Sequence, residues 1–263
     1  MADEFVGVME AVITREAPTA RVIHVSHLIG RHDVWAGAMT LWRAAPWLVP
    51  GVILAVVDPG VGTERRAVAL EVADAGAVLI GPDNGLLLPA AARLGPITAA
   101  VELPTDPAVP GATFAGRDIF APAAARAADG VALEALGSPV DPTTLIGRPV
   151  PEPVPEEDGR LRSEILWVDH FGNAQLNVDL PRLQGALGGV SAAAVVAAIG
   201  ERRLHLRIVA SYGVIADEEV ALVVDSYGLL ALSCNRSSAA GRLAVGPGEP
   251  VWLCAEPGPV TVP

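Results

Sequence analysis

The sequence predicts two folded parts: an α/β N-terminal domain with a mostly parallel sheet (residues 1–140) and a C-terminal antiparallel β-barrel domain (residues 161–263). Up to about residue 140, segments of strand and helix character alternate, which is typical of a sheet covered by helices on both faces. Repeated prolines in residues 141–160 exclude helix interiors and central strands, so this stretch is predicted to be a Pro-rich linker. The short β-branched segments that follow, separated by glycine, proline and acidic turns, indicate a small barrel or sandwich.

Each expected element is identified by its apolar pattern and its bounding turn residues. In the N-terminal domain we expect helices at VGVMEAVI (6–13), VWAGAMTLWRAA (34–45) and GLLLPAAARLG (85–95), and strands at RVIHVSHLI (21–29), GVILAVVD (51–58), AVALEVA (67–73) and VLIG (78–81). In the C-terminal domain we expect strands at EILWVD (164–169), AQLNVD (174–179), VSAAAVVAAI (190–199), LHLRIV (204–209), VALVVDSYG (220–228), LLALSC (229–234) and PVWLCA (250–255).

Composition excludes several classes of protein. With 51% apolar and 18% charged residues, the chain of 263 residues is expected to fold compactly, and a net charge of −12 argues against a nucleic-acid partner. Cys234 and Cys254 have no metal-ligand spacing, and no cluster of His, Asp and Glu has it either, so neither a disulfide framework nor a metal is predicted. The acidic start and the short apolar runs predict no signal peptide and no membrane span, hence a cytoplasmic protein.

The stretch AVVDPGVGTERRAV (55–68) is the first candidate site. Asp58 follows an apolar run that is expected to form a strand, and ligands of α/β sheets bind outside the carboxyl ends of strands. Glycines in the following loop permit a tight turn and close approach of a ligand, while Arg65 can return its guanidinium to the Asp58 carboxylate. The alternative is a turn closed by an ion pair with no role in chemistry.

Two further strand ends carry weaker signals. Asp83 and Asn84, in GPDNGLL, are of the types that commonly form turns and helix caps. We therefore favour a role in the turn over a role in chemistry for these two residues. Gly116 and Arg117 precede a helical stretch, where exposed backbone amides could bind an anion or an oxygen nucleophile.

In the C-terminal domain, WVDHFGNAQLN (167–177) interrupts a strand with polar residues beside an aromatic one. The carboxylate of Asp169 suits an ammonium group, Asn173 suits base edges, and Phe171 suits stacking on a purine. The alternative is a β-bulge with a turn. A second segment, DSYGLLALSCNRSSA (225–239), is predicted to be a hairpin, with Ser226, Asn235 and Arg236 at its ends.

Taken together and in this order, VVDPGVGTERR, GPDNGLL, TFAGRDIFAP, VDHFGNAQLN and DSYGLLALSCNRSSAA resemble the S-adenosyl-L-methionine (SAM) hydroxide adenosyltransferases, relatives of the fluorinating and chlorinating adenosyltransferases. The resemblance implies an N-terminal α/β domain, a C-terminal β-barrel, and a homotrimer whose ligand lies between the first domain of one subunit and the second domain of its neighbour. It implies hydrolysis of SAM to adenosine and L-methionine, with SAM as substrate and no separate cofactor.

The resemblance also implies roles for particular residues. Asp58 and Arg65 would be catalytic and would ready a water molecule for attack on ribose C5′. An anion at Asp58 would also oppose chloride or fluoride by about 1 to 4 kcal/mol at roughly 4 Å, depending on screening. The substrate-binding positions would be Asp169 and Ser226 for the methionine end, Asn173 and the backbone around Asn235 and Arg236 for adenine, Phe171 for apolar faces, and the Gly116 amide for the nucleophile.

Two departures from the family pattern open alternatives. Ala115 stands where the family has a histidine of the water-activating set, whose loss commonly costs about 10² to 10⁴ in rate. Relatives also carry a strand with a ribose-binding aspartate before the segment that matches residues 3–7, so we expect an upstream start, a fragment, or a sheet without that strand. The alternative functions are a catalytically impaired SAM- or adenosine-binding protein and, less favoured, a halide adenosyltransferase.

Overall fold

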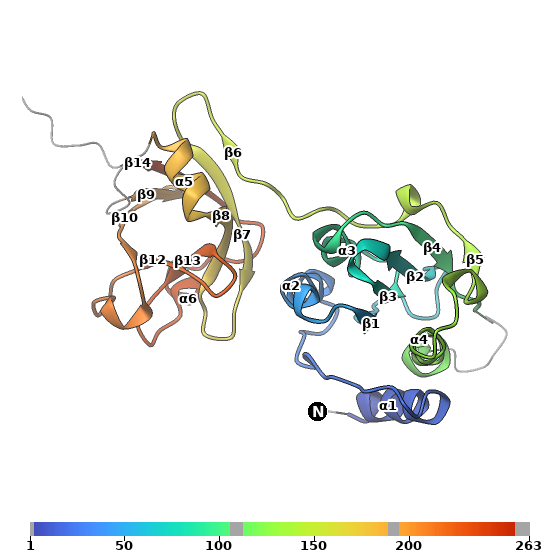
Figure 1. The fold of residues 1–263 in the computed structure, drawn as a ribbon. Helices are drawn as coiled ribbons and strands as arrows, with labels where there is room; N and C mark the ends of the chain where they lie inside the picture. The colour runs from blue at the N-terminus through green and yellow to red at the C-terminus, as the bar shows by residue number, and fades with distance from the viewer. Residues whose placement is uncertain (1–2, 106–112, 189–194, 256–263) are drawn as a thin grey trace, which may run out of the picture. The chain divides into compact units, whose positions relative to one another are not determined.

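A computed structural model describes residues 3–105, 113–188 and 195–255 (Figure 1). The chain divides into two compact units, Met1–Pro149 and Val150–Pro263, and the division falls within the stretch predicted to be a linker. In the described parts of the chain, no helix is long and apolar enough to cross a membrane.

The N-terminal unit is built on a mixed five-stranded sheet of order β1-β3-β2-β4-β5 (Figure 1). Among the described strands of this sheet only β1 and β3 pair in parallel, so the sheet is mixed and the expectation of a mostly parallel one is corrected. The reason lies in the connection of β2 to β3, which is only residues 73–76 long, whereas a parallel crossover needs about a dozen residues. The strands are β1 Gly51–Leu54, β2 Ala67–Val72, β3 Ala77–Pro82, β4 Ala99–Glu102 and β5 Ser138–Pro139.

Helices pack on this sheet and leave the carboxyl ends of β1 and β3 near the loops that carry the candidate site. The helix expected around residues 34–45 is confirmed as α2, and Asp33 caps it by accepting a hydrogen bond from Ala36 N at 2.8 Å. The helices are α1 Phe5–Glu16, α2 Val34–Ala44, α3 Leu88–Leu94 and α4 Ala121–Ala128, with short turns η1 Ala45–Trp47, η2 Ala73–Ala75, η3 Gly116–Phe120, η4 Leu133–Ala135 and η5 Pro142–Thr144.

The strand expected at residues 21–29 is wrong. This segment forms no regular element and pairs with no strand among the described residues. Its apolar side chains Ile23, Val25 and Leu28 are exposed, Leu28 by 89%. β-Branched residues favour a strand only where a neighbouring strand supplies backbone partners and a face to pack on, and here neither is present.

The C-terminal unit is a nearly closed, barrel-like sheet. Together with the sheet and helices of the N-terminal unit, it confirms the prediction of an α/β domain followed by a β-barrel domain. Its described strands run in the order β10-β9-β14-β7-β8-β13-β12-β11, with β6 paired to β7, and among them only β11 and β12 pair in parallel. The elements are β6 Val154–Pro155, β7 Leu161–Val168, β8 Ala174–Asp179, β9 Val195–Ile199, β10 Arg202–Leu206, β11 Ile208–Val209, β12 Ala221–Val224, β13 Leu229–Ser233, β14 Pro250–Ala255, α5 Leu180–Ala186, η6 Tyr212–Val214 and α6 Ala239–Leu243.

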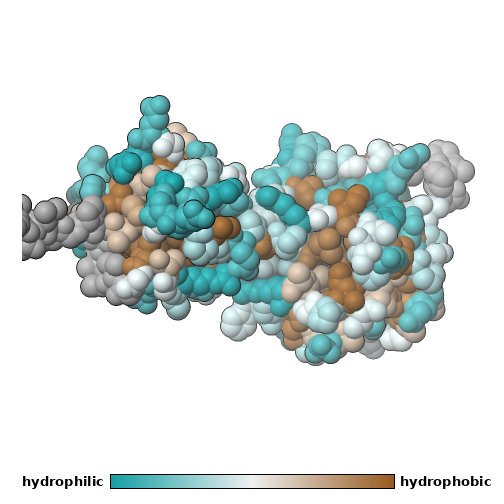
Figure 2. All heavy atoms as spheres, turned by 90° about the horizontal axis from the view of Figure 1, so that it is seen from above, coloured by the Kyte–Doolittle hydropathy of each residue, from teal (hydrophilic) through white to brown (hydrophobic). Residues whose placement is uncertain are grey.

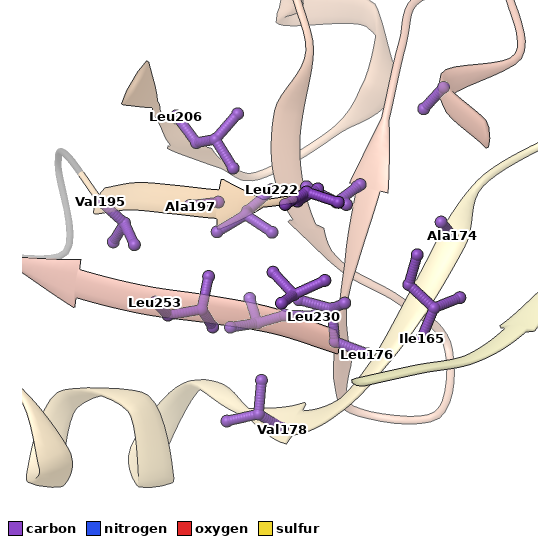
Figure 3. Packing of buried hydrophobic residues seen from close by; sticks show 14 of the residues in the cluster. Ile165, Ala174, Leu176, Val178, Val195, Ala197, Leu206, Leu222, Leu230 and Leu253 are labelled. Carbon is purple, nitrogen blue, oxygen red and sulfur yellow. The ribbon is translucent and has the colours of Figure 1, made fainter. Parts of the chain in front are cut away.

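The barrel encloses an apolar core. Leu176, Leu230 and Leu253 have no exposed surface and point with their neighbours into the interior (Figure 3). The strand expected at residues 204–209 is broken at Arg207, between β10 and β11, and residues 190–194 of the strand expected at 190–199 lie outside the described residues. Complete burial of one leucine stabilises the fold by about 1.5–3 kcal/mol.

Candidate active site

The loop that follows β1 closes on itself through an ion pair between Asp58 and Arg65. Arg65 Nε donates to Asp58 Oδ1 at 3.0 Å, and Arg65 Nη2 donates to the other carboxylate oxygen. The side chains of Arg65 and Asp58 are only 10% and 6% exposed. Gly62, with φ of 77°, makes the turn that brings the two ends together. The structure therefore joins the two predicted catalytic residues in a nearly buried, two-bonded pair.

The same loop packs against the segment that carries Gly116. The Arg65 guanidinium carbon lies 5.4 Å from the centre of the Phe120 ring, a cation–π distance. Ala115 is 5% exposed and belongs to a buried cluster with Phe120, against which Val61 of the Asp58 loop also packs. Position 115 thus belongs to the buried cluster on which the Asp58 loop packs through Val61.

Gly116 has a packing reason to be glycine. A Cβ there would lie 2.7 Å from Met9 Sδ and 3.0 Å from the Phe114 ring, so the Met9 side chain of helix α1 would have to shift. Phe5 of the same helix meets Phe114 edge to face, with ring centres 4.8 Å apart. The role of the Gly116 amide toward a nucleophile stays a prediction.

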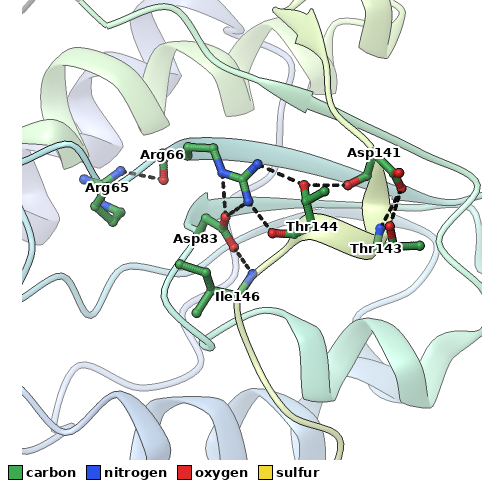
Figure 4. Close-up of polar contacts among 7 residues, drawn as sticks. All are labelled: Arg65, Arg66, Asp83, Asp141, Thr143, Thr144 and Ile146. Atoms are coloured by element: carbon green, nitrogen blue, oxygen red, sulfur yellow. Dashed lines mark hydrogen bonds and ion pairs between the residues drawn. The ribbon is translucent and has the colours of Figure 1, made fainter.

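A second ion pair lies next to the first, at the carboxyl end of β3 (Figure 4). Arg66 Nε donates to Asp83 Oδ2 at 2.9 Å, and the other Asp83 oxygen accepts from Ile146 N at 2.7 Å. The Arg66 guanidinium also reaches Thr144, through its hydroxyl at 3.1 Å and its carbonyl at 2.6 Å. Asp83, only 4% exposed, and Arg66 together therefore fasten residues 144–146 to the end of β3.

In the C-terminal unit, the turn between β7 and β8 is organised around Asp169. Asp169 Oδ1 accepts from the amides of Phe171 and Asn173, each at 2.9 Å, and Oδ2 accepts from Asn173 Nδ2 at 2.8 Å. Every donor is neutral, so the carboxylate keeps its net negative charge. Phe171 is 76% exposed, while Asn173 is 8% exposed. The arrangement offers an anion, an exposed ring and an oriented amide within five residues.

Gly172 joins this turn to the segment that carries Asn235 and Arg236. Its φ is 82°, and a Cβ would lie 2.5 Å from Ser238 Cβ and 2.8 Å from Ser238 Cα. The Gly172 carbonyl also accepts from Ala240 N at 2.9 Å. The structure thus brings the predicted Asp169–Asn173 turn against residues 238–240, which follow the predicted 235–236 segment in the chain.

The turn that contains Ser226 is tied to the same region by a buried glutamine. Gln175, two residues beyond Asn173, donates to Asp225, whose other oxygen accepts from the amides of Tyr227 and Leu229 at 2.8 and 3.1 Å. Ser226 itself is exposed. Gln175 therefore ties the turn that contains Ser226 to the strand that follows Asn173.

Tyr212, in the η6 turn, is a residue that the sequence did not single out. Burial raises the pKa of its hydroxyl, and the negative charges of Asp169 and Asp225 raise it further. The phenol therefore stays protonated at neutral pH and is placed near both carboxylates. Tyr212 lies in an SYG turn (211–213) that resembles the DSYG turn at residues 225–228. That similarity is the sequence feature that could have pointed to Tyr212.

Exposed apolar side chains lie beside both groups of candidate residues. Large apolar side chains show among polar ones on the surfaces of both units (Figure 2). Val56 is 36% exposed near Asp58, and Tyr212 and Tyr227 are 41% and 44% exposed near Asp169 and Ser226. Among the described residues, no group of His, Cys, Asp and Glu has the geometry of a metal site.

Comparison with known proteins identifies relatives of the whole chain. The family model of the SAM hydroxide adenosyltransferase N-terminal domain matches residues 1–137, and that of the C-terminal domain matches residues 163–252. An (R)-S-adenosyl-L-methionine hydrolase of Salinispora tropica is 47% identical, covering 97% of this chain and 94% of that protein. One of Thermus thermophilus is 37% identical over 96% of this chain and 95% of that protein.

More distant matches extend the same picture. A fluorinase of Actinoplanes sp. is 26% identical, covering 89% of this chain and 87% of that protein. The crystal structure of an uncharacterized conserved protein from Thermotoga maritima superposes with a TM-score of 0.85 at 29% identity, covering 97% of both chains. The likeness therefore covers both units and their order in the chain.

Proposed function

The chain belongs to the SAM hydroxide adenosyltransferase family, and we propose on that premise that it is an enzyme that hydrolyses S-adenosyl-L-methionine to adenosine and L-methionine. The relatives named as SAM hydrolases, at 37–47% identity over nearly the whole chain, support the substrate and the reaction. The observation that carries the proposal is the nearly buried Asp58–Arg65 pair at the carboxyl end of β1.

The chemistry asks little of the leaving group and much of the water. As the water oxygen attacks ribose C5′, the C5′–S bond breaks and its electron pair returns to sulfur, so methionine leaves as a neutral thioether without a general acid. The water must lose a proton, and a positioned carboxylate can accept it. Arg65 occupies one lone-pair direction on each Asp58 oxygen, and a carboxylate has about four such directions, so positions remain free for the water.

The C-terminal unit supplies groups that match the rest of the substrate. Asp169 keeps a net negative charge among neutral donors and would bind the methionine ammonium, with Ser226 beside it. Asn173 donates to Asp169, which leaves its carbonyl oxygen for the amino edge of adenine. The exposed Phe171 ring would cover an apolar face of the ligand.

We further propose a homotrimer in which Asp58 of one subunit and Asp169 of its neighbour share one substrate molecule. Coexpressed Asp58→Asn and Asp169→Asn chains test this sharing, because each variant supplies the residue that the other lacks. Random assembly should restore about a quarter of the parent activity, since one interface in four then joins two intact residues. If the coexpressed chains form adenosine no faster than either variant alone, the shared site is rejected. Activity without an added cofactor and location in the cytoplasm are further predictions.

The direct test is incubation with SAM and chromatography for adenosine. Asp58→Asn should reduce the rate by about 10² to 10⁴, because the proton acceptor is lost. It also leaves Arg65 without its anion, which can cost roughly 3–5 kcal/mol of stability, so folding must be checked by circular dichroism at the assay temperature. A folded Asp58→Asn variant with parent activity would refute the mechanism.

A second candidate function is a protein that binds SAM or adenosine without turning it over. The observation that favours it is Ala115, a residue of the buried cluster on which Val61 of the Asp58 loop packs, where the family pattern has histidine. This candidate predicts SAM binding by calorimetry, no adenosine from the parent chain, and adenosine from the Ala115→His variant. Formation of 5′-chloro-5′-deoxyadenosine with chloride present would instead establish halide transfer.

A further inference from the structure

Asn84 holds the main chain immediately before Asp58. Its Nδ2 donates to the Val57 carbonyl at 2.9 Å, and its Oδ1 accepts from Leu86 N at 3.2 Å. The two bonds fix which end of the amide faces Val57, because only the nitrogen can donate. Asn84 therefore links the end of β3 to Val57, the residue immediately before Asp58.

Asp83, the neighbour of Asn84, holds the main chain immediately after Arg65. The Arg66 carbonyl accepts from Asp83 N at 2.9 Å and also from Arg65 Nη1 at 2.9 Å (Figure 4). The Asp83 carboxylate meanwhile binds the Arg66 side chain. The Arg66 carbonyl thus accepts one hydrogen bond from the Asp83 amide and another from the Arg65 guanidinium, which also binds Asp58.

From this geometry we propose that Asn84, supported by Asp83, is a positioning residue for the Asp58–Arg65 pair. The two adjacent residues anchor both ends of the 58–65 loop on one strand end, at Val57 and at Arg66. Arg65 supplies both oxygens of Asp58 with donors, so the direction of the carboxylate depends on both anchors. The proposal rests on the proposed function only for its kinetic consequence, since the anchoring can be measured without turnover.

The sharpest variant is Asn84→Asp, which removes a single donor. An aspartate can still accept from Leu86 N and has nearly the same size, but it has no N–H for the Val57 carbonyl. Asn84→Ala serves as the second variant, because it removes both bonds without adding a charge. If one of the two fails to fold, the other still tests the proposal.

Asn177 offers a matched control in the C-terminal unit. Its Nδ2 donates to the Pro151 carbonyl at 3.0 Å and its Oδ1 accepts from Glu164 N at 2.9 Å, the two kinds of bond that Asn84 makes, and Oδ1 also accepts from Ser163 Oγ at 2.8 Å. Asn177→Ala should lower the thermal midpoint, because it removes the hydrogen bonds of a buried asparagine. It should leave the rate of adenosine formation per folded molecule at the parent value.

Kinetics separate positioning from a general structural role. Both Asn84 variants should lower kcat by about 10- to 100-fold with little change in KM, because a small misplacement of a catalytic group costs about that much. In an Asp58→Asn background the same substitutions should change kcat by less than about twofold, since the group they position is already gone. An equal loss in both backgrounds would overturn the proposal.

If the parent chain forms no adenosine, the proposed function is rejected, and the positioning role must be tested by a measurement that does not depend on turnover. The Arg65 Nε–H resonance, assigned by its absence in Arg65→Lys, should exchange slowly with solvent in the parent and in Asn177→Ala. It should broaden or disappear in Asn84→Asp and Asn84→Ala at temperatures where both remain folded. An unchanged resonance in the two folded Asn84 variants would refute the positioning role whatever the activity of the parent.

Discussion

Gly172 is the position at which a single added methyl group should disturb the Asp169–Asn173 turn, the substrate-binding turn of our proposal. It stands between Phe171 and Asn173, has φ of 82°, and approaches Ser238 closely. The Gly172→Ala substitution therefore meets two separate obstacles. The backbone must hold alanine in the left-handed region, and the new Cβ must displace the backbone of the segment at Ser238.

The magnitude follows from adding the two effects. A non-glycine residue in the left-handed region costs about 1–2 kcal/mol. Overpacking against atoms that cannot move freely costs typically 1–3 kcal/mol more, and the Cβ would lie 2.8 Å from the Ser238 Cα, a backbone atom. The expected loss in the free energy of unfolding is therefore about 2–5 kcal/mol.

The measurement is urea unfolding followed by fluorescence, combined with SAM affinity by calorimetry. Gly159→Ala is the matched control, because Gly159 has φ of 78° but nothing within 4 Å of its added Cβ. The control should lose only about 1–2 kcal/mol and keep its affinity for SAM. Equal losses of stability in the two variants would show that Ser238 does not enforce the glycine, and the reasoning about close approach would fail.

Three further predictions concern the core, the pH dependence and the family histidine. Leu176→Ala should lower the free energy of unfolding by about 2–5 kcal/mol in urea titrations, because Leu176 is fully buried. Hydrogen bonds from Arg207 and from the Ala216 amide lower the pKa of Glu219 from 4.5 to about 2, so its contribution to stability is present above pH 4.5 and is lost as the pH falls toward about 2. Unfolding free energies measured across that range should fall less steeply in Glu219→Gln than in the parent, and equal slopes would contradict this. Ala115→His should lower the thermal midpoint, because an imidazole in place of a methyl overpacks a buried cluster by about 1–3 kcal/mol, and an unchanged midpoint would show that the cluster has room.

The sequence was informative where local chemistry determines the structure. Apolar periodicity located helix α2, and the alternating segments of the second half predicted the barrel, because these signals depend on which face of an element is buried. The pairing of Asp58 with Arg65 was likewise foreseeable, since glycines permit the tight loop and the two side chains are complementary.

The sequence was misleading where structure depends on a distant partner. Residues 21–29 have strong β character, but strand formation requires a neighbour that no local pattern reveals. The direction of β2 followed from the short connection at residues 73–76, which periodicity alone does not weigh. Asp83 and Asn84 looked like ordinary turn residues because their partners, Val57, Arg66 and Ile146, are far away in the sequence.

The two carboxylates at the centre of the proposal differ in net charge, and this difference assigns their tasks. Asp169 is surrounded by neutral N–H donors and stays an anion, which suits the ammonium of methionine. Asp58 shares its charge with Arg65, so the pair is close to neutral and repels a halide less than an isolated carboxylate would. Discrimination against chloride then rests on hydrogen bonding: water can donate a proton to Asp58, whereas chloride cannot. Chloride should therefore inhibit adenosine formation only weakly, and competitive inhibition at low millimolar chloride would show that the nucleophile is held by charge instead.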